Sequence, residues 1–388
     1  MKICDLTQFY SPVSGGVRRY IEQKAAHVKR QGGKARHVLV VPGEKTGCEG
    51  DDITKVYTIA SPLVSRTSRY RMLLKLHLVE EVLERERPDI IESGDPYQLA
   101  WKAIASGRAL GIPVVGFYHS HFPEALLRTV AKFTGGIAPA IASDAARRYV
   151  KTLYNRFETT FVPSPALASL LTSWGVDAVD SIDLGVDTHI FQPSHVPVTQ
   201  LRKELGLPQD KRILLYVGRL APEKNVQTLF SAYSLLRNRA DCHLVVVGDG
   251  TQRSSVERLK KRTGSLTWIP YCGDPGELAN IYRAADLFVH PGIQETFGLV
   301  TLESQACGTP VVGIRGSYMD RIIFSDQISW AQENTPESLA EAIEAKLGRD
   351  LVALGRTAGE AVRSNYSWEK IFDHIFGVYS RVVGNYCD

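Results

Sequence analysis

The chain has 388 residues, of which 44% are hydrophobic and 23% are charged, with a formal net charge of +4. This length exceeds one ordinary core and predicts two domains. The mild charge argues against a dedicated nucleic-acid binder. The six cysteines include no C-x-x-C pair, which argues against a zinc site or redox dithiol and fits a reducing compartment.

The chain shows no targeting or membrane-spanning pattern. Its N-terminus lacks the unbroken apolar segment of a signal peptide. No apolar run reaches the ~20 residues that a bilayer-spanning helix needs. We therefore expect a cytoplasmic protein.

Short apolar runs alternate with amphipathic patterns through the first half of the chain. A strand is predicted over residues 1–6 and a helix over 17–33, with Gly32 as its C-terminal stop. Further strands are predicted over 35–43, 86–94, 112–120 and 159–165. Strands separated by helices indicate a parallel, doubly wound α/β sheet.

The second half restarts the same pattern. Strands are predicted over 212–220, 242–250, 266–273, 285–292 and 309–316. The unbroken apolar run from Ile213 to Val217 is typical of a strand covered on both faces. A Pro-rich polar stretch, Gln192 to Val198, marks the linker. The fold class is therefore α/β, with two Rossmann-like domains facing a cleft.

Several charged side chains follow the strands of the second domain. Arg219 and Lys224 follow the first of these strands, and ligands in such sheets bind at the carboxyl ends of the strands. Arg and Lys both suit phosphate oxygens. The backbone amides of Phe297, Gly298 and Leu299, at a predicted helix start, add further donors.

Two glutamates, Glu295 and Glu303, lie beside this anion-binding helix start. Eight residues of helix rise ~12 Å, comparable to the distance between two sugars that flank a diphosphate. Carboxylates accept hydrogen bonds from pairs of hydroxyls. Glu303 would hold a ribose and Glu295 a second sugar. The pattern predicts a nucleotide diphosphate sugar as the ligand.

At this point the sequence resembles a known family, the retaining GT-B glycosyltransferases of family 4 (glycosyl transferases group 1). The resemblance rests on the E-x7-E spacing and on the segments GRLAPEKN and GVDTHIFQP. It also rests on SPVSGGV, FYHSHF, TTFVPSPAL and YSWEKIF. The combination covers most of the chain and is specific, whereas each motif alone is weak.

The resemblance implies three parts of the chain with different roles. Residues 1–191 would form the acceptor-binding domain and residues 199–365 the nucleotide-sugar-binding domain. Residues 366–388 would form a C-terminal helix that crosses back to the first domain.

The resemblance also implies roles for single residues. Arg219 and Lys224 would grip the diphosphate and stabilise the leaving group. His119 would lie over the sugar near the reacting carbon. Other donor-binding positions would be Gly15, Gly16, Tyr271, Cys272, Glu295, Thr296, Phe297, Gly298, Leu299 and Glu303.

The implied reaction is a retaining hexosyl transfer without an essential metal or other cofactor. Fixed cations lower the barrier by stabilising the diphosphate as it leaves. The chain contains no Asp-x-Asp motif, the usual metal site of other glycosyltransferases. No residue suggests itself as a nucleophile for double displacement, so we favour attack from the leaving-group face.

The donor base and sugar stay open between UDP-linked and GDP-linked sugars, and the acceptor is a sugar or a lipid-linked group. Basic residues lie beside leucines in one stretch: Arg66, Arg69, Arg71 and Lys75. A second stretch carries Arg128, Lys132, Arg147, Arg148, Lys151 and Arg156. Basic amphipathic surface suits peripheral contact with an anionic inner membrane face, although such stretches are more often solvated helix faces.

Other functions stay open at this point. A nucleotide-sugar epimerase, a sugar phosphorylase or a transferase with a small soluble acceptor could share the architecture. A non-catalytic sugar-nucleotide sensor could keep Arg219 and Glu303 without His119. The stretch VVVGDGTQR imitates a dinucleotide fingerprint, but Arg253 replaces its last glycine, which makes a dehydrogenase a weak competitor.

Overall fold

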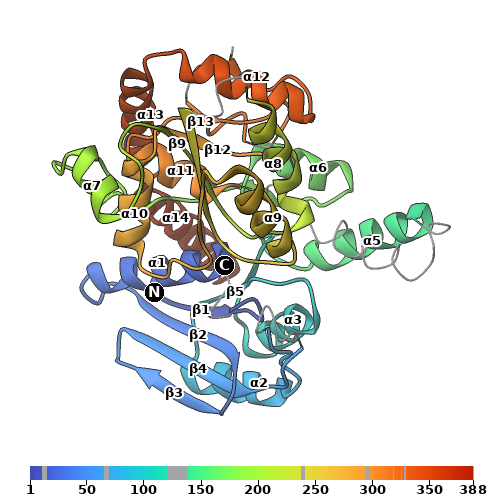
Figure 1. Cartoon of the computed structure of the whole chain (residues 1–388). Helices are drawn as coiled ribbons and strands as arrows, with labels where there is room; N and C mark the ends of the chain where they lie inside the picture. Colours follow the sequence, from blue (N-terminus) through green and yellow to red (C-terminus); the bar gives the residue numbers. More distant parts are fainter. Residues whose placement is uncertain are drawn as a thin grey trace. The chain divides into compact units, whose positions relative to one another are not determined.

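The chain folds into two compact units in the computed structural model (Figure 1). The first unit comprises Met1–Leu184 and Trp368–Asp388, and the second comprises Gly185–Ser367. The structure describes residues 1–10, 15–64, 70–119, 139–236, 241–293, 297–317, 319–324, 326 and 329–387, without the side chains of 139–142 and 387. None of the helices in these ranges is long and apolar enough to cross a membrane.

An eight-stranded sheet forms the centre of the first unit, in the order β3-β4-β2-β1-β5-β6-β7-β8. All neighbouring strands pair in parallel except β3 with β4. The strands are β1 (Lys2–Leu6), β2 (Arg36–Gly43), β3 (Gly47–Gly50), β4 (Thr54–Ala60), β5 (Ile90–Ser93), β6 (Val114–Phe117), β7 (Thr160–Val162) and β8 (Val179–Ser181).

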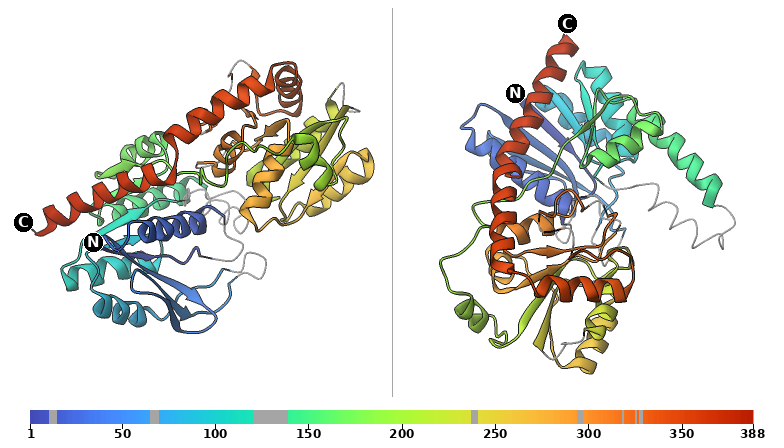
Figure 2. Two further views of the ribbon diagram at one scale, coloured as in Figure 1. Left: turned by 90° about the vertical axis from the view of Figure 1, so that its left-hand side faces the viewer. Right: turned by 90° about the horizontal axis from the view of Figure 1, so that it is seen from above.

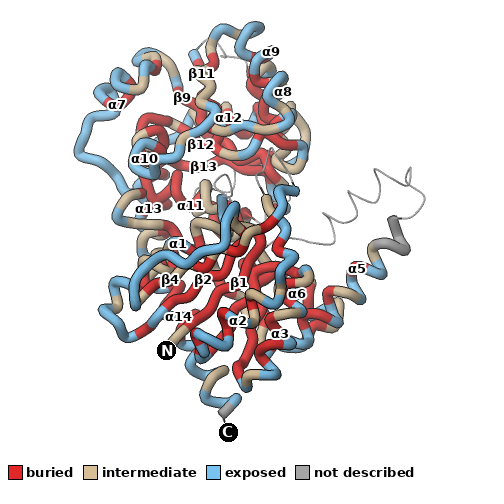
Figure 3. The backbone as a smooth tube through the Cα atoms, turned by 90° about the horizontal axis from the view of Figure 1, so that it is seen from below, coloured by how far each residue is buried: buried red, intermediate tan, exposed pale blue. Residues whose placement is uncertain are grey.

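Helices cover this sheet: α1 (Gly16–Arg30), α2 (Leu76–Glu86), α3 (Gln98–Leu110), α5 (Pro139–Tyr154), α6 (Pro165–Ser173) and α14 (Trp368–Cys387). The central strands β1 and β2 are buried along most of their length (Figure 3). The C-terminal helix α14 packs against α1, although the two are separated by almost the whole sequence (Figure 2).

The second unit has a five-stranded parallel sheet, in the order β11-β10-β9-β12-β13. Its strands are β9 (Arg212–Val217), β10 (Cys242–Val247), β11 (Leu266–Ile269), β12 (Leu287–Val289) and β13 (Val311–Val312). The apolar residues of β9 are buried from Ile213 to Val217, as expected for a central strand covered on both faces. Two α/β sheets, the second parallel throughout and the first parallel apart from β3, confirm the predicted α/β class with two Rossmann-like domains.

The helices of the second unit are α7 (Val198–Glu204), the short 3-10 helix η1 (Pro222–Lys224), α8 (Val226–Leu235), α9 (Arg253–Thr263), α10 (Pro275–Ala284), α11 (Leu299–Ala306), α12 (Pro336–Leu347) and α13 (Leu351–Asn365). Two of them begin with a capping side chain followed by proline. Asp274 accepts from Glu277 N at 2.8 Å, and Thr335 accepts from Ser338 N at 3.2 Å. Both caps satisfy a free amide at the helix start.

The structure differs from the sequence pattern at several places in the first unit. Strands β3, β4 and β8 were not predicted. Residues 185–191, predicted as the end of the first domain, have their contacts in the second unit. Val186 N donates to Tyr366 O at 2.7 Å, and Arg283 Nη2 donates to Ile190 O at 2.6 Å.

The backbones that follow β9 and β10 approach one another closely. A Cβ on Gly248 would lie 2.0 Å from the carbonyl oxygen of Gly218, and Gly248 has φ +132°. A Cβ on Gly250 would lie 2.4 Å from the carbonyl oxygen of Leu220. Glycine is therefore required where these two loops meet.

We expect Gly248→Ala to destabilise the second unit by at least about 1–3 kcal/mol, the usual cost of a strained backbone, because a steric overlap adds to the positive φ. Gly264→Ala is the matched control, since Gly264 has φ +65° but open space around its Cβ position. Differential scanning calorimetry should show a larger loss of Tm for Gly248→Ala. Equal losses would contradict the role of the close approach.

Candidate active site

The candidate site residues of the second unit gather at the carboxyl edge of its sheet. Strand β9 pairs with β10 on one side and with β12 on the other, so chain order reverses across β9. The loops that follow these strands carry Arg219, Asp249 and His290. Such a switch point is where open α/β sheets bind ligands.

Backbone and side-chain hydrogen bonds join these loops to one another. Leu220 N donates to Asp249 O at 3.0 Å, which joins the loops after β9 and β10. Asn225 Nδ2 donates to Pro291 O at 2.9 Å, which joins the loop after β9 to the loop after β12. Asn225 takes a left-handed conformation with φ 55°. The segment with Arg219 and Lys224 is thus fixed against its neighbours on both sides.

Arg219 and Lys224 differ in their surroundings. The Arg219 side chain is 67% exposed and forms an ion pair with Glu223 at 2.9 Å. Such an exposed pair is weak and leaves the guanidinium able to bind an anion. Lys224 ends η1 and is half-buried. The structure therefore places two cations on the loop that follows β9.

The start of α11 is set by Gly298, which has φ 80° and precedes the first helical residue, Leu299. Phe297 is buried, with the guanidinium of Arg321 5.3 Å from its ring centroid. Because the helix begins at Leu299, the assumption of unbroken helix from residue 295 to 303 is wrong. From Leu299 to Glu303 the helix rises only ~6 Å. Glu295 and Thr296 lie outside the described residues.

Glu303 projects from the second turn of α11 and is 1% exposed. The hydroxyl of Tyr282, on α10, donates to Glu303 Oε2 at 3.0 Å. A buried carboxylate needs such donors, and one from a neighbouring helix orients it. The sequence pattern missed Tyr282, because an apolar helix position gives no sign of a hydroxyl aimed at another helix.

The predicted base-binding loop follows β11. Tyr271 is 69% exposed, which leaves its aromatic face open to solvent. Cys272 Sγ donates to Asp274 O at 3.6 Å. Burial, reinforced by Glu277 and Asp274, raises the pKa of the Cys272 thiol, so it stays protonated at neutral pH.

Gly15 and Gly16, in the first unit, lie at the start of α1 and are exposed. Gly15 has φ −87°, which other residues adopt readily. A Cβ at Gly15 would meet no heavy atom of the described residues within 4 Å. Neither steric crowding nor backbone strain within these residues explains glycine at position 15.

His119 follows β6 in the first unit, where it is half-buried and packs against aromatic rings. Its ring stacks on Phe117 with centroids 3.9 Å apart and meets the edge of Tyr20 at 5.2 Å. Burial, helped by the Lys24 ammonium and opposed by Asp5, lowers the pKa of His119 to about 3. The imidazole is therefore neutral at physiological pH.

Models of two glycosyltransferase families match the chain. The model described as Glycosyltransferase Family 4 matches residues 14–190, and the model described as Glycosyl transferases group 1 matches residues 197–350. Together they cover both units.

The chain belongs to the family 4 glycosyltransferases.

Relatives of this glycosyltransferase match over nearly its whole length. It is 29% identical to a GDP-mannose-dependent alpha-mannosyltransferase of Corynebacterium glutamicum, over 99% of this chain and 89% of the relative. It is 28% identical to a GDP-mannose-dependent alpha-(1-6)-phosphatidylinositol dimannoside mannosyltransferase of Mycobacterium tuberculosis, over 90% of this chain and 88% of the relative.

The fold of this glycosyltransferase is similar to that of sucrose-phosphate synthase from Thermosynechococcus elongatus. The TM-score is 0.77 at 21% identity, covering 99% of both chains. The likeness confirms the GT-B class for the fold.

The neutral state of His119 can be tested through the pH dependence of stability. An unfolded histidine ionises near pH 6.5, so the unfolded chain binds the proton more tightly than the folded chain does. Stability should therefore fall as the pH drops from 6.5 towards 3, by up to about 1.4 kcal/mol per pH unit from this group.

Urea unfolding of the wild-type chain and of His119→Gln across this pH range provides the measurement. The wild-type free energy of unfolding should fall more steeply than that of the variant. Parallel curves would show that His119 is protonated in the folded state.

Proposed function

We propose that this glycosyltransferase transfers mannose from GDP-mannose to a lipid-linked acceptor and retains the anomeric configuration. The observation that carries the proposal is the position of the Glu303 carboxylate, which is buried on α11 and oriented by Tyr282. The N-terminal turn of α11 lies at the same edge of the sheet as the loop after β9, which carries Arg219 and Lys224. Carboxylate and cations can then bind different parts of one ligand, a hydroxyl-bearing sugar and a diphosphate.

The diphosphate would bind between Arg219, Lys224 and the start of α11. The amides of Phe297, Gly298 and Leu299 would donate to its oxygens, aided by the positive end of the helix dipole. Thr301, on the first turn of α11, has a fully buried hydroxyl with no hydrogen-bond partner among the described residues. A buried unsatisfied hydroxyl supports a polar ligand at this position.

The remaining donor contacts are proposed from the family resemblance together with the described side chains. Glu303, oriented by Tyr282, would accept hydrogen bonds from the ribose hydroxyls. Glu295 and Thr296 would contact the transferred sugar, and the base would lie against the exposed ring of Tyr271 and the loop at Cys272.

Gly15 and Gly16 would let the backbone of the first unit approach the donor. Open space around the Cβ position of Gly15 supports this role, because the described part of the fold does not itself demand glycine there.

In the reaction, the cations stabilise negative charge on the departing diphosphate while the sugar carbon gains positive character. A neutral His119 would lie by the sugar without adding a positive charge that opposes this change. The acceptor hydroxyl would attack from the face that the diphosphate leaves, which retains the configuration. As the bond between the sugar carbon and the diphosphate oxygen breaks, that oxygen would take the proton of the hydroxyl. We propose that Arg219 and Lys224 make an essential metal unnecessary.

The assignment of GDP-mannose draws on four relatives that are named as GDP-mannose-dependent mannosyltransferases. One relative acts on a phosphatidylinositol dimannoside, which supports a lipid-linked acceptor. An epimerase or phosphorylase is not favoured, since the matched relatives are transferases.

We propose that the first unit contacts an anionic membrane face. Among the described residues between 63 and 101, six large apolar side chains are exposed: Leu63, Val64, Met72, Leu74, Tyr97 and Trp101. Phe9 contacts both Tyr70 and Tyr97 with ring centroids 5.9 Å apart, which links the segment around Tyr70 to the residue before α3. Leucines with exposed tyrosine and tryptophan suit the membrane interface.

The basic residues support this contact unequally. Arg71 pairs with Glu44 at 2.8 Å and Arg148 with Asp144 at 2.8 Å, which reduces their contribution. Lys75 and Lys151 are exposed. Arg66, Arg69, Arg128 and Lys132 lie outside the described residues.

A thermal-shift panel with GDP, UDP, ADP and their sugars tests the donor. GDP and GDP-mannose should raise the Tm most, because ligands that bind only the folded chain stabilise it. Glu303→Ala should abolish the shift, whereas Glu257→Ala, an exposed residue of α9, should keep it. A larger shift with another nucleotide would refute GDP as the base.

Loss of the cations should slow transfer without unfolding the chain. We expect Arg219→Ala and Lys224→Ala each to lower kcat by about 10²–10³-fold, the usual effect of removing one group that stabilises developing charge. Lys261→Ala, on the exposed end of α9, should keep full activity, and EDTA should leave the wild-type rate unchanged. Near-normal turnover in the two site variants would rule out their role.

Cosedimentation with phosphatidylglycerol vesicles at low salt tests the membrane contact. The wild-type chain should bind, and Val64→Asp with Leu74→Asp should lose most of the binding, since carboxylates oppose both insertion and the anionic lipid. Leu235→Asp is the matched control, because Leu235 is 49% exposed in the second unit. Absence of wild-type binding would disprove the contact.

A further inference from the structure

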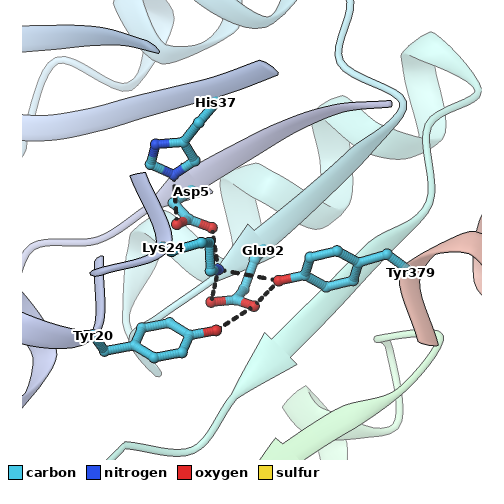
Figure 4. Close-up of polar contacts among 6 residues, drawn as sticks. All are labelled: Asp5, Tyr20, Lys24, His37, Glu92 and Tyr379. Atoms are coloured by element: carbon cyan, nitrogen blue, oxygen red, sulfur yellow. Dashed lines mark hydrogen bonds and ion pairs between the residues drawn. The ribbon is translucent and has the colours of Figure 1, made fainter. Parts of the chain in front are cut away.

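A buried cluster of charged and hydroxyl groups lies within the first unit (Figure 4). We call it the Lys24 cluster, and its members are Asp5, Tyr20, Lys24, His37, Glu92 and Tyr379. Lys24 is completely buried, and its Nζ donates to Asp5 Oδ1 at 2.9 Å and to Glu92 Oε1 at 2.9 Å. It also donates to the hydroxyl of Tyr379 at 3.1 Å.

The two carboxylates of the Lys24 cluster are satisfied by further donors. His37 Nε2 donates to Asp5 Oδ2 at 2.8 Å. Glu92 Oε2 accepts from Tyr20 OH at 3.2 Å and from Tyr379 OH. Although burial alone would raise it, Lys24 and His37 lower the pKa of Asp5 to about 2. Burial raises the pKa of Glu92, opposed by the Lys24 ammonium.

Stability alone does not explain such a cluster. Desolvating three charges is costly, and well-packed apolar side chains in their place often give equal or greater stability. The Lys24 cluster does have a geometric consequence, because its hydrogen bonds fix the two tyrosine hydroxyls on one carboxylate oxygen. Its members come from β1, α1, β2, β5 and α14, so it also fixes these elements together.

Tyr20 lies between the Lys24 cluster and His119. The ammonium of Lys24 is 4.5 Å from the centroid of the Tyr20 ring, and the hydroxyl of Tyr20 is held by Glu92. The same ring meets the His119 ring with centroids 5.2 Å apart. Any movement of Tyr20 would therefore change the packing around His119.

The C-terminal helix α14 contacts Tyr20 at the same time. Trp368 and Phe372 place their ring centroids 6.2 Å and 5.6 Å from that of Tyr20. Tyr379 lies two turns beyond Phe372 on α14, and its hydroxyl accepts a hydrogen bond from Lys24 and donates one to Glu92. Helix α14 therefore fixes Tyr20 both by ring contact and through Glu92.

We propose that Tyr20 is a positioning residue that couples the docking of helix α14 to the placement of His119. Through the Lys24 cluster, α14 holds Tyr20 in the orientation that keeps the His119 ring stacked on Phe117. The functional part of this inference rests on the proposed role of His119 in sugar transfer. The structural coupling is independent of that role.

The test uses full-length Tyr379→Phe and Tyr20→Phe, each of which removes one hydroxyl from Glu92. Tyr57→Phe is the matched control, since the buried Tyr57 donates to Glu86 Oε1 at 2.6 Å elsewhere in the same unit. For each variant we would measure kcat, the donor KM, and the imidazole nitrogen signals of His119 by NMR.

We expect both cluster variants to shift the His119 signals. They should lower kcat by about tenfold or more, because small misplacements near reacting atoms are costly. Their donor KM should stay within about twofold of wild type, since the donor-binding residues of the second unit are unchanged. Tyr57→Phe should change neither the signals nor kcat.

The coupling would be overturned if Tyr379→Phe and Tyr20→Phe left the His119 signals and kcat unchanged, as Tyr57→Phe is expected to do. If Tyr379→Phe does not fold, Phe372→Leu replaces it, because it removes a ring contact with Tyr20 and keeps apolar volume. Unshifted His119 signals in that variant would also overturn the coupling. If the signals shift but His119→Ala transfers sugar normally, the coupling stands and the proposed role of His119 in the reaction fails.

Discussion

Parallel pairing of β9 with both β10 and β12 is the constraint on which the second unit depends. It brings three strand ends to one edge, and only glycine at 248 and 250 lets the loops after β9 and β10 meet. Once these backbones are in contact, hydrogen bonds from Leu220 and Asn225 fix the cationic loop. The placement of the candidate binding residues therefore follows from strand topology.

The first unit depends on a different interaction, the buried hydrogen bonds and ion pairs of the Lys24 cluster. A neutral histidine, His119, follows β6 of its sheet and packs against the rings of Phe117 and Tyr20. A satisfied ion cluster is directional, since each hydrogen bond specifies both distance and angle. The Lys24 cluster uses residues far apart in the sequence to fix the aromatic ring against which His119 packs.

The sequence predicted much of the fold and part of the site. Apolar runs such as Ile213–Val217 identify buried strands because both faces need apolar side chains. The short strands β3 and β8 escaped prediction, since β3 is exposed and β8 has only three residues. The helix start near Phe297 to Leu299 was predicted, but the assumption of unbroken helix from residue 295 was wrong, because the left-handed conformation of Gly298 is a backbone property.

Tertiary partners of the site could not be predicted from local pattern. Tyr282 and Asn225 act through contacts with residues 21 and 66 positions away. One feature of the sequence does indicate that Lys24 is buried. It follows Tyr20 and precedes Val28 at four-residue spacing, which places it on the apolar face of α1. Its partners Asp5, Glu92 and Tyr379 become visible only once the strands and α14 are assembled.

Retaining transfer from a nucleotide sugar is the central claim, and the fate of a labelled sugar tests it most directly. GDP-mannose labelled with carbon-13 at the reacting carbon would be incubated with the chain and a mannosylated phosphatidylinositol acceptor, and the product examined by NMR. The account predicts release of GDP and a lipid-linked mannose with the donor's α configuration. A product of inverted configuration, or no transfer, would contradict it.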